Sequence, residues 1–303
     1  MRTTLILTCL NEADNIGRLL ESVINQSVKP DEMIIVDAGS VDGTIDIIEN
    51  LRKKNKWIKL IIARGISRGG GRNLAIKKAK NEIIAVTDAG CILEKNWLKN
   101  IIAPLKEYDV VVGYYKPFYE NDFQFFCGQL LVPKKLNLVR ISSRSLAFKK
   151  SIIEEIGGYE ENVDVGEDTL FHWKIMKKNF KVKFEKSAVV YWIMPKNSKE
   201  LFKKFFKYGA GYWQTINLKE FKKFLLLIFG SYSYLFLLVF SVVTKIFYLT
   251  NFLILFLLLG LLYTGVKGVL TTKKLRALLY IPYIFLLKNL SFIIGFSLRK
   301  IKR

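Results

Sequence analysis

Short apolar runs alternate with segments of helical spacing along the first 112 residues. Each run ends in a polar or glycine-containing turn and shows no polar alternation, which is typical of strands covered on both faces. Helical segments are predicted to begin near Asn15, Thr44 and Leu74, between the runs. This alternation of strand and helix predicts right-handed crossovers and a parallel sheet. The predicted strands are residues 4–9, 32–36, 57–63, 83–86 and 109–112.

Acidic residues follow two of these strands. Asp37 follows the strand at 32–36, and Asp88 follows the strand at 83–86 and precedes a glycine turn. Open parallel sheets bind ligands just outside the carboxyl ends of their strands, so both acids are candidates for a binding site. A purely structural alternative is that Asp88 caps the helix expected near Glu94.

A glycine-rich turn at residues 67–73 precedes the predicted helix at 74–79. It lacks the Gly-Lys-Ser/Thr of a P-loop and does not follow the first strand, so neither common nucleotide-binding fingerprint applies. Arg68 and Arg72 at the amino end of a helix would still suit a diphosphate. The alternative is a flexible turn with solvated arginines.

A second pair of acids, Glu167 and Asp168, is predicted to open a helix that runs to Lys178. Acids in the first turn of a helix usually complement its dipole. The same dipole also keeps a carboxylate ionised and able to accept a proton, so the pair is a candidate general base.

The carboxyl-terminal third is much more apolar than the rest. Residues 224–243 and 246–266 each approach the roughly 20 residues that a membrane-spanning helix needs. Residues 277–298 are interrupted by Pro282 and Lys288, and we expect an interfacial helix or a third membrane crossing there. The predicted organisation is a domain at 1–220, which ends in a basic interfacial helix, and a membrane region at 221–303.

The net charge of +22 would ordinarily suggest a nucleic-acid-binding protein. The lysines gather beside the apolar segments, however, as expected for chain facing an anionic cytoplasmic leaflet, and no nucleic-acid-binding motif accompanies them. The first residues are too short for a signal-peptide core, and the three cysteines lack metal-ligand spacing. These features predict a multi-pass protein of the cell membrane with a cytoplasmic head and no nucleic-acid partner.

The motifs in this order resemble glycosyltransferase family 2, whose catalytic domains have the GT-A fold. The resemblance covers about residues 3–192 and is most specific in Asp-Ala-Gly-Ser-x-Asp-Gly-Thr at 37–44. It implies an α/β, Rossmann-like domain with a mostly parallel sheet, followed here by a helical membrane tail. The other matching pieces are Thr-Cys-Leu-Asn-Glu at 8–12, Arg72-Asn73, Asp88, residues 142–148 and Glu167-Asp168.

The resemblance also implies roles for individual residues. Asp37 and the residues at 8–12 would hold the nucleotide, Arg68 and Arg72 would approach the diphosphate, and Asp168 would be the general base beside Glu167. The implied donor-binding residues are Thr8, Leu10, Glu12, Asp37, Gly39, Arg68, Arg72, Asp88 and Ala89. The implied acceptor-binding residues are Ser142, Ser143, Arg144 and Ser145.

Asp88 matches the first acid of the family's Asp-x-Asp element, which helps to place a divalent cation, Mg²⁺ or Mn²⁺, on the diphosphate. Gly90 stands at the third position of that element, so one usual contact to the cation is missing. The Gln-x-x-Arg-Trp element of processive members is also missing, and residues 205–213 stand in its place. The resemblance therefore implies a metal bound through Asp88 and one sugar added per encounter.

The leading hypothesis is an inverting, non-processive glycosyltransferase. Its partners would be a nucleotide-sugar donor, a hydroxyl of a lipid-linked or cell-surface glycan, and the membrane. One alternative is a synthase that moves a sugar onto polyprenyl phosphate. Another is a catalytically silent, membrane-attached protein that binds nucleotide sugars.

Overall fold

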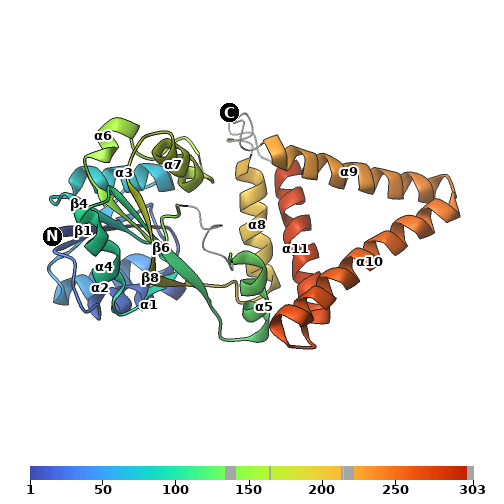
Figure 1. Cartoon of the computed structure of the whole chain (residues 1–303), viewed down its shortest axis with the longest axis horizontal. Coiled ribbons are helices and arrows are strands. Elements are labelled where there is room, and N and C mark those ends of the chain that lie inside the picture. The colour runs from blue at the N-terminus through green and yellow to red at the C-terminus, as the bar shows by residue number, and fades with distance from the viewer. Residues whose placement is uncertain (134–140, 164, 213, 215–221, 299–303) are drawn as a thin grey trace. The chain divides into compact units, whose positions relative to one another are not determined.

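The computed structural model describes residues 1–133, 141–163, 165–212, 214 and 222–298. The chain forms two compact units (Figure 1). The first unit comprises Met1–Tyr119 and Val132–Met194, and the second comprises Glu120–Leu131 and Pro195–Arg303. A segment between two strands of the first unit therefore belongs to the second.

The first unit is built on one sheet. Within the described ranges its strand order is β3-β2-β1-β4-β7-β6-β8-β5. The pairs among β1 to β4 are parallel, whereas β7 is antiparallel to both of its neighbours and β5 is antiparallel to β8. The strands are β1 (Thr3–Cys9), β2 (Glu32–Asp37), β3 (Ile58–Ile62), β4 (Ile83–Val86), β5 (Cys91–Leu93), β6 (Val110–Phe118), β7 (Leu146–Lys149) and β8 (Val182–Ile193).

Helices cover both faces of this sheet, which is why the middle residues of its central strands are apolar without polar alternation. In β1, Leu5 and Leu7 face one core and Ile6 faces the other. Helices α1, α2 and α4 pack on the first face, and α3, α6 and α7 pack on the second (Figure 1). The helices of this unit, with one 3-10 turn, are α1 (Ala13–Ile24), α2 (Thr44–Lys54), α3 (Arg68–Lys78), α4 (Trp97–Ile102), η1 (Ala103–Lys106), α6 (Ile152–Ile156) and α7 (Glu167–Met176).

The sheet differs from the sequence prediction in its second half. The strand predicted to end near Gly113 continues to Phe118, with a register shift between Val112 and Tyr114. A Cβ on Gly113 would lie 2.0 Å from Ser145 Oγ, so the strand can pass β7 here only with glycine. Strands β5, β7 and β8 were not predicted, and β8 has no buried position in its first half, Val182–Ser187.

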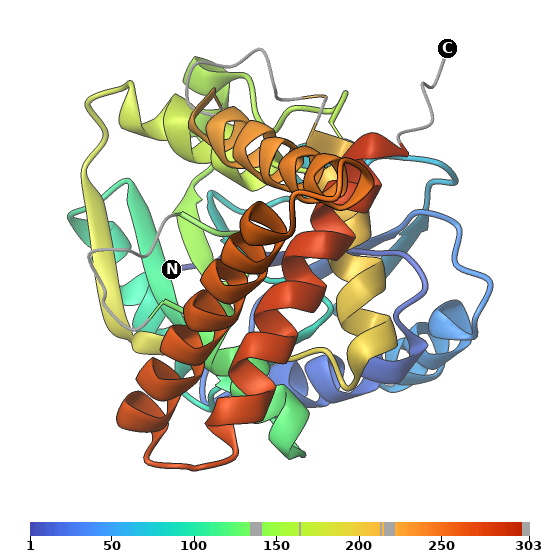
Figure 2. The same ribbon diagram turned by 90° about the vertical axis from the view of Figure 1, so that its right-hand side faces the viewer.

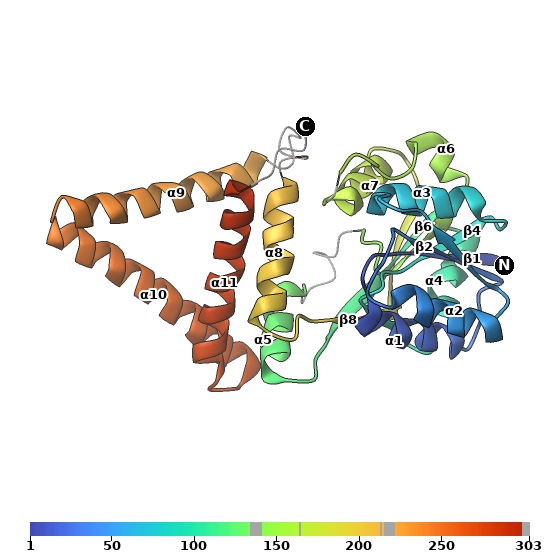
Figure 3. The ribbon, with the colours of Figure 1, turned by 180° about the vertical axis from the view of Figure 1, so that it is seen from behind.

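The second unit is helical. Helix α8 lies beside α11, and α9 and α10 are joined by a short turn from which they diverge (Figures 2 and 3). Gly209 of α8 and Gly295 of α11 allow close contact, because a Cβ on either would lie 2.0 or 2.1 Å from a carbonyl oxygen of the other helix. The helices are α5 (Asp122–Leu131), α8 (Ser198–Tyr212), α9 (Lys222–Val243), α10 (Phe247–Thr272) and α11 (Ala277–Ser297).

Two of these helices have the length and composition to cross a membrane. They are α10, with a mean hydropathy of 2.2, and α11, with 1.8. The segment Ile228–Val243 of α9 is apolar but shorter among the described residues. The basic interfacial helix predicted at the end of the domain at 1–220 begins as α8. Its last part falls on residues 215–221, which lie outside the described part of the chain.

Candidate active site

The loops after β1 and β2 are joined to one another. In the parallel register Cys9 lies opposite Asp37, so the two loops begin side by side. The Asp37 carboxylate is fully buried and accepts hydrogen bonds from the backbone N–H groups of Gly39 and Ser40 at 2.8 and 2.7 Å. It also accepts the Ser40 hydroxyl at 2.6 Å and the Cys9 thiol at 3.3 Å. Asp37 therefore shapes its own loop in this structure.

Asp42 connects the same loop to the start of α1. Its carboxylate accepts the backbone N–H of Ala13 at 3.0 Å and the Thr44 hydroxyl at 2.6 Å. The Thr44 hydroxyl oxygen in turn accepts the backbone N–H of Glu12 at 2.8 Å. These bonds hold the two predicted nucleotide-binding segments together and leave Leu10, 53% exposed, at the surface.

The remaining residues predicted for the donor lie close to this region. Gly39 has φ +101°, and a Cβ there would lie 3.0 Å from Arg64 Cγ, so only glycine fits without strain. Thr8 lies against α3, because a Cβ on Gly71 would come within 2.8 Å of its methyl group. Ala89 is buried beside Asp88 in the turn after β4.

The glycine-rich turn forms the first turns of α3. Ser67 caps this helix by accepting the backbone N–H of Gly70 at 3.0 Å. A Cβ on Gly69 would lie 2.0 Å from the carbonyl oxygen of Glu160, so glycine allows the helix to approach the neighbouring loop closely. The glycines therefore let α3 pack closely on its neighbours, and the Arg72 side chain on this helix is buried.

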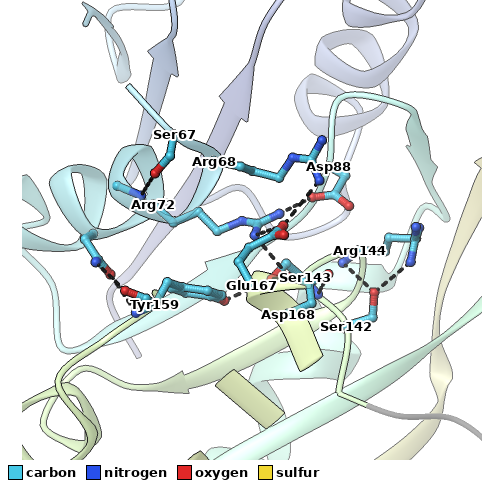
Figure 4. A network of polar contacts seen from close by, with 12 residues as sticks. Ser67, Arg68, Arg72, Asp88, Ser142, Ser143, Arg144, Tyr159, Glu167 and Asp168 are labelled. Carbon is cyan, nitrogen blue, oxygen red and sulfur yellow. Dashed lines mark hydrogen bonds and ion pairs between the residues drawn. The ribbon is translucent and has the colours of Figure 1, made fainter. Parts of the chain in front are cut away.

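Arg72 joins three acids that come from different parts of the chain (Figure 4). Its Nη2 donates to Asp88 Oδ1 at 2.8 Å. Its Nη1 donates to Glu167 Oε1 and Asp168 Oδ1, each at 3.0 Å. Asp88 thus pairs with Arg72, and the helix expected to be capped by it begins instead after Asn96. Two acid motifs 79 or more residues apart in the sequence meet at one guanidinium.

Asp168 is held from its other side as well. The Ser143 hydroxyl donates to Asp168 Oδ1 at 2.5 Å, and the Ser143 backbone N–H donates to Oδ2 at 3.3 Å. The Tyr159 hydroxyl lies 3.0 Å from Ser143 Oγ (Figure 4). The Asp168 side chain nevertheless remains 23% exposed, so its carboxylate is fixed in position and still accessible.

Asp88 and Asp168 have pKa values displaced in opposite directions. Burial raises the pKa of Asp168, and the nearby charges of Glu167 and Asp88 add to this effect, so that Arg72 and Ser143 reverse it only in part. Burial also raises the pKa of Asp88, but Arg72, Arg144 and Arg68 outweigh burial and lower it overall. Such a pair provides one persistent anion and one stronger proton acceptor.

The predicted acceptor segment separates into two parts. Ser143 and Ser145 are buried and have protein partners, and Ser145 Oγ accepts the indole N–H of Trp97 at 2.8 Å. Arg144 donates to Ser142 Oγ at 2.9 Å, and its Cζ lies 4.1 Å from the centroid of the Trp192 ring. All three serines of this segment are buried, so only the partly exposed Arg144 remains accessible at the site.

Sequence reasoning gave no role to three aromatic residues at this site. The ring of Tyr159 faces the Arg72 guanidinium, whose carbon lies 5.1 Å from the ring centroid. Tyr159 also stacks on Phe171. Tyr115 and Trp192 flank Arg144. The Gly-Gly pair before Tyr159 was the available signal, because both glycines have positive φ and place the ring in the core.

Of the two acids in the family's cation-binding element, this chain supplies only Asp88. Among the described residues no group of three or more His, Cys, Asp or Glu is arranged to hold a metal. A Cβ on Gly90 would meet nothing within 4 Å, so the turn has room at the position of the missing acid. Because Mg²⁺ often takes one or two carboxylates together with substrate phosphates, Asp88 fits a cation held mainly by a bound diphosphate.

Comparison with proteins of assigned activity gives two informative relatives. The O-antigen chain rhamnosyltransferase RfbN of Salmonella typhimurium is 26% identical over 228 residues, which cover 69% of this chain and 72% of RfbN. The poly-beta-1,6-N-acetyl-D-glucosamine synthase of Staphylococcus aureus is 22% identical over 249 residues. That match covers 74% of this chain and 60% of the synthase, so the chain spans only part of that relative's length.

Comparison with solved structures supports the fold. The crystal structure of S. aureus TarS 1–349 in complex with UDP-GlcNAc has a TM-score of 0.54 at 19% identity, over 72% of this chain and 68% of TarS 1–349. The complex of the same protein with UDP has a TM-score of 0.53 at 21% identity. The likeness shows the GT-A fold.

The first half of the chain carries the family pattern itself. Residues 4–158 match the family described as glycosyl transferase family 2, and they include β1, β2, α3 and Asp88. Helix α7 with Glu167 and Asp168 follows this match and completes the cluster of acids around Arg72. The chain therefore belongs to glycosyl transferase family 2 and is a glycosyltransferase.

Proposed function

We propose that this glycosyltransferase moves a sugar from a nucleotide-sugar donor to a hydroxyl of a lipid-linked or cell-surface glycan, with inversion and one sugar per encounter. The observation that carries the proposal is the arrangement of Asp168. A sugar hydroxyl must lose a proton as it attacks, so the reaction needs a base. Asp168 has a raised pKa, an accessible carboxylate and fixed bonds on two sides.

In the reaction, the acceptor oxygen attacks the anomeric carbon while the bond to the diphosphate breaks. Asp168 takes the hydroxyl proton, and the nucleoside diphosphate leaves with the electron pair of the broken bond. A single displacement of this kind inverts the anomeric centre. The base supports a hydroxyl acceptor, because a phosphate monoester is already an anion near neutral pH and needs no proton acceptor.

The donor would bind at the loops after β1, β2 and β4. The TarS complexes with UDP and UDP-GlcNAc support a nucleotide-sugar donor on this fold. Arg68, 50% exposed, lies at the amino end of α3 and would neutralise the diphosphate together with that helix terminus. A divalent cation, bound by Asp88 and the diphosphate, would supply further charge neutralisation for the leaving group.

We also propose that the chain is a multi-pass membrane protein whose first unit faces the cytoplasm. The lengths and compositions of α10 and α11 support a membrane location. Lys273, Lys274 and Arg276 between these helices favour the cytoplasmic side for that connection by the positive-inside tendency.

A thermal-shift screen against a panel of nucleotide sugars, with and without Mn²⁺, tests the donor assignment. A donor present at a hundred times its dissociation constant should stabilise the protein by about 2.7 kcal/mol. Asp88→Asn should reduce that shift, whereas the control Asp109→Asn should keep it. Asp109 is similarly exposed and pairs with Lys149, but it lies at the opposite end of the sheet, at the start of β6. A panel without any shift, or equal shifts in both variants, would contradict the proposal.

A further inference from the structure

The two arginines of the glycine-rich turn differ sharply in their surroundings. The Arg68 side chain is 50% exposed, and its Nη1 lies 3.3 Å from Glu167 Oε1. The Arg72 side chain is 1% exposed. The family resemblance implies the same diphosphate role for both residues, yet only Arg68 presents an accessible guanidinium.

The Arg72 guanidinium is enclosed by protein groups on each side that the structure describes. One terminal nitrogen of Arg72 donates to Asp88, and the other donates to both Glu167 and Asp168. The ring of Tyr159 covers one face, and Arg72 Nε has no partner among the described residues. A diphosphate could reach this guanidinium only by displacing one of the three carboxylates that it binds.

We propose that Arg72 is a positioning residue for the base Asp168 and not a ligand of the diphosphate, which is contacted by Arg68. Arg72 fixes the distance between the donor-side acid Asp88 and the acceptor-side acid Asp168 through its two terminal nitrogens. Ser143 completes the support by holding Asp168 from the opposite side. This inference rests on the proposed function, because it assumes that Asp168 acts as the base.

The positioning role requires a guanidinium rather than a positive charge alone. The planar fork aims separate N–H groups at three carboxylates, whereas an ammonium is a point charge on a flexible stem. The backbone that carries Arg72 is also fixed, because Gly69 and Gly71 bring α3 against Glu160 and Thr8. A lysine at position 72 would keep the charge and lose the geometry.

The test compares Arg72→Lys with Arg68→Gln in the full chain. Steady-state kinetics with the donor found in the panel gives kcat and KM, and calorimetry with UDP and uridine separates the diphosphate from the base and ribose. Arg72→Lys should lower kcat at least tenfold. The ratio of its affinity for UDP to its affinity for uridine should stay within about twofold of the wild-type ratio. Arg68→Gln should lower that ratio about tenfold or more, because a bond to a charged group is lost.

A second variant covers the case in which Arg72→Lys does not fold. Ser143→Ala removes the other bond to Asp168 and should also lower kcat without changing the UDP-to-uridine ratio. If Arg72→Lys or Ser143→Ala lowers the ratio as Arg68→Gln does, with kcat unchanged, the positioning assignment is wrong. Failure of the proposed function has a different signature, since the wild-type protein would then bind no nucleotide sugar in the panel.

Discussion

Glu167 and Asp168 are adjacent in sequence but differ in accessibility. Glu167 is 3% exposed and pairs with Arg72, whereas Asp168 is 23% exposed and has the raised pKa. A base must be ionised to accept a proton, so turnover should fall as Asp168 becomes protonated. Because the pKa of Asp168 is raised, this fall should begin at a higher pH than for an ordinary aspartate, whose pKa is about 4.

Glu167→Gln should shift this acidic limb to lower pH. The negative charge of Glu167 raises the pKa of Asp168. Removing that charge lowers this pKa, so Asp168 stays ionised to a lower pH. Profiles of kcat against pH for the wild-type protein and the variant measure the shift. A limb that stays in place, or that moves to higher pH, would show that Asp168 is not the group whose titration limits turnover.

At the residue scale, the sequence predicted which residues gather at the site better than it predicted their contacts. Asp88, Glu167 and Asp168 meet at Arg72, as the family resemblance implied by giving them roles at one site. The burial of Arg72, Ser143 and Ser145 could not be predicted, because it depends on how α3, α7 and β7 approach one another.

At the element scale, the glycines of α3 are a packing requirement that stability measurements can test. Gly69→Ala would place a methyl group 2.0 Å from the Glu160 carbonyl oxygen, so the free energy of unfolding should fall by about 1–3 kcal/mol. Gly90→Ala is the matched control, since its Cβ meets nothing within 4 Å, and it should change stability by only about 0.5 kcal/mol. Urea unfolding of both variants makes the comparison. Equal stability of the two would contradict the close packing of α3.

Strands β1 to β4 were predicted from short apolar runs, and each was found near its predicted position. Strand β8 was missed because its first half carries Lys183, Glu185 and Lys186 and has no buried position. Helix α5 was missed because aromatic residues in its sequence suit helix and strand equally. In both cases tertiary packing selects the element.

At the scale of the whole molecule, the orientation in the membrane is the open prediction. We expect α9 and α10 to cross as a hairpin around Lys245, with Lys273 on the cytoplasmic side and α11 at the interface. Single cysteines at these positions report the topology, because the native Cys9, Cys91 and Cys127 are buried. Lys245→Cys should react with an impermeant reagent on intact cells, and Lys273→Cys should react only after permeabilisation.

Leu298→Cys decides the path of α11, since this residue lies just after the helix and is 66% exposed. An interfacial α11 predicts reaction only after permeabilisation. Reaction on intact cells would instead make α11 a third crossing, which its length and composition permit.

The most direct test of the account is sugar transfer by Asp168→Asn. The assay uses the radiolabelled donor found in the panel and supplies a hydroxyl-bearing glycan acceptor and polyprenyl phosphate in separate reactions. Loss of a positioned base should reduce turnover onto the glycan by roughly 10²–10⁴-fold, while donor binding stays nearly unchanged. Transfer to polyprenyl phosphate at an undiminished rate by the variant would contradict the account, as would a glycan transfer rate equal to that of the wild-type protein.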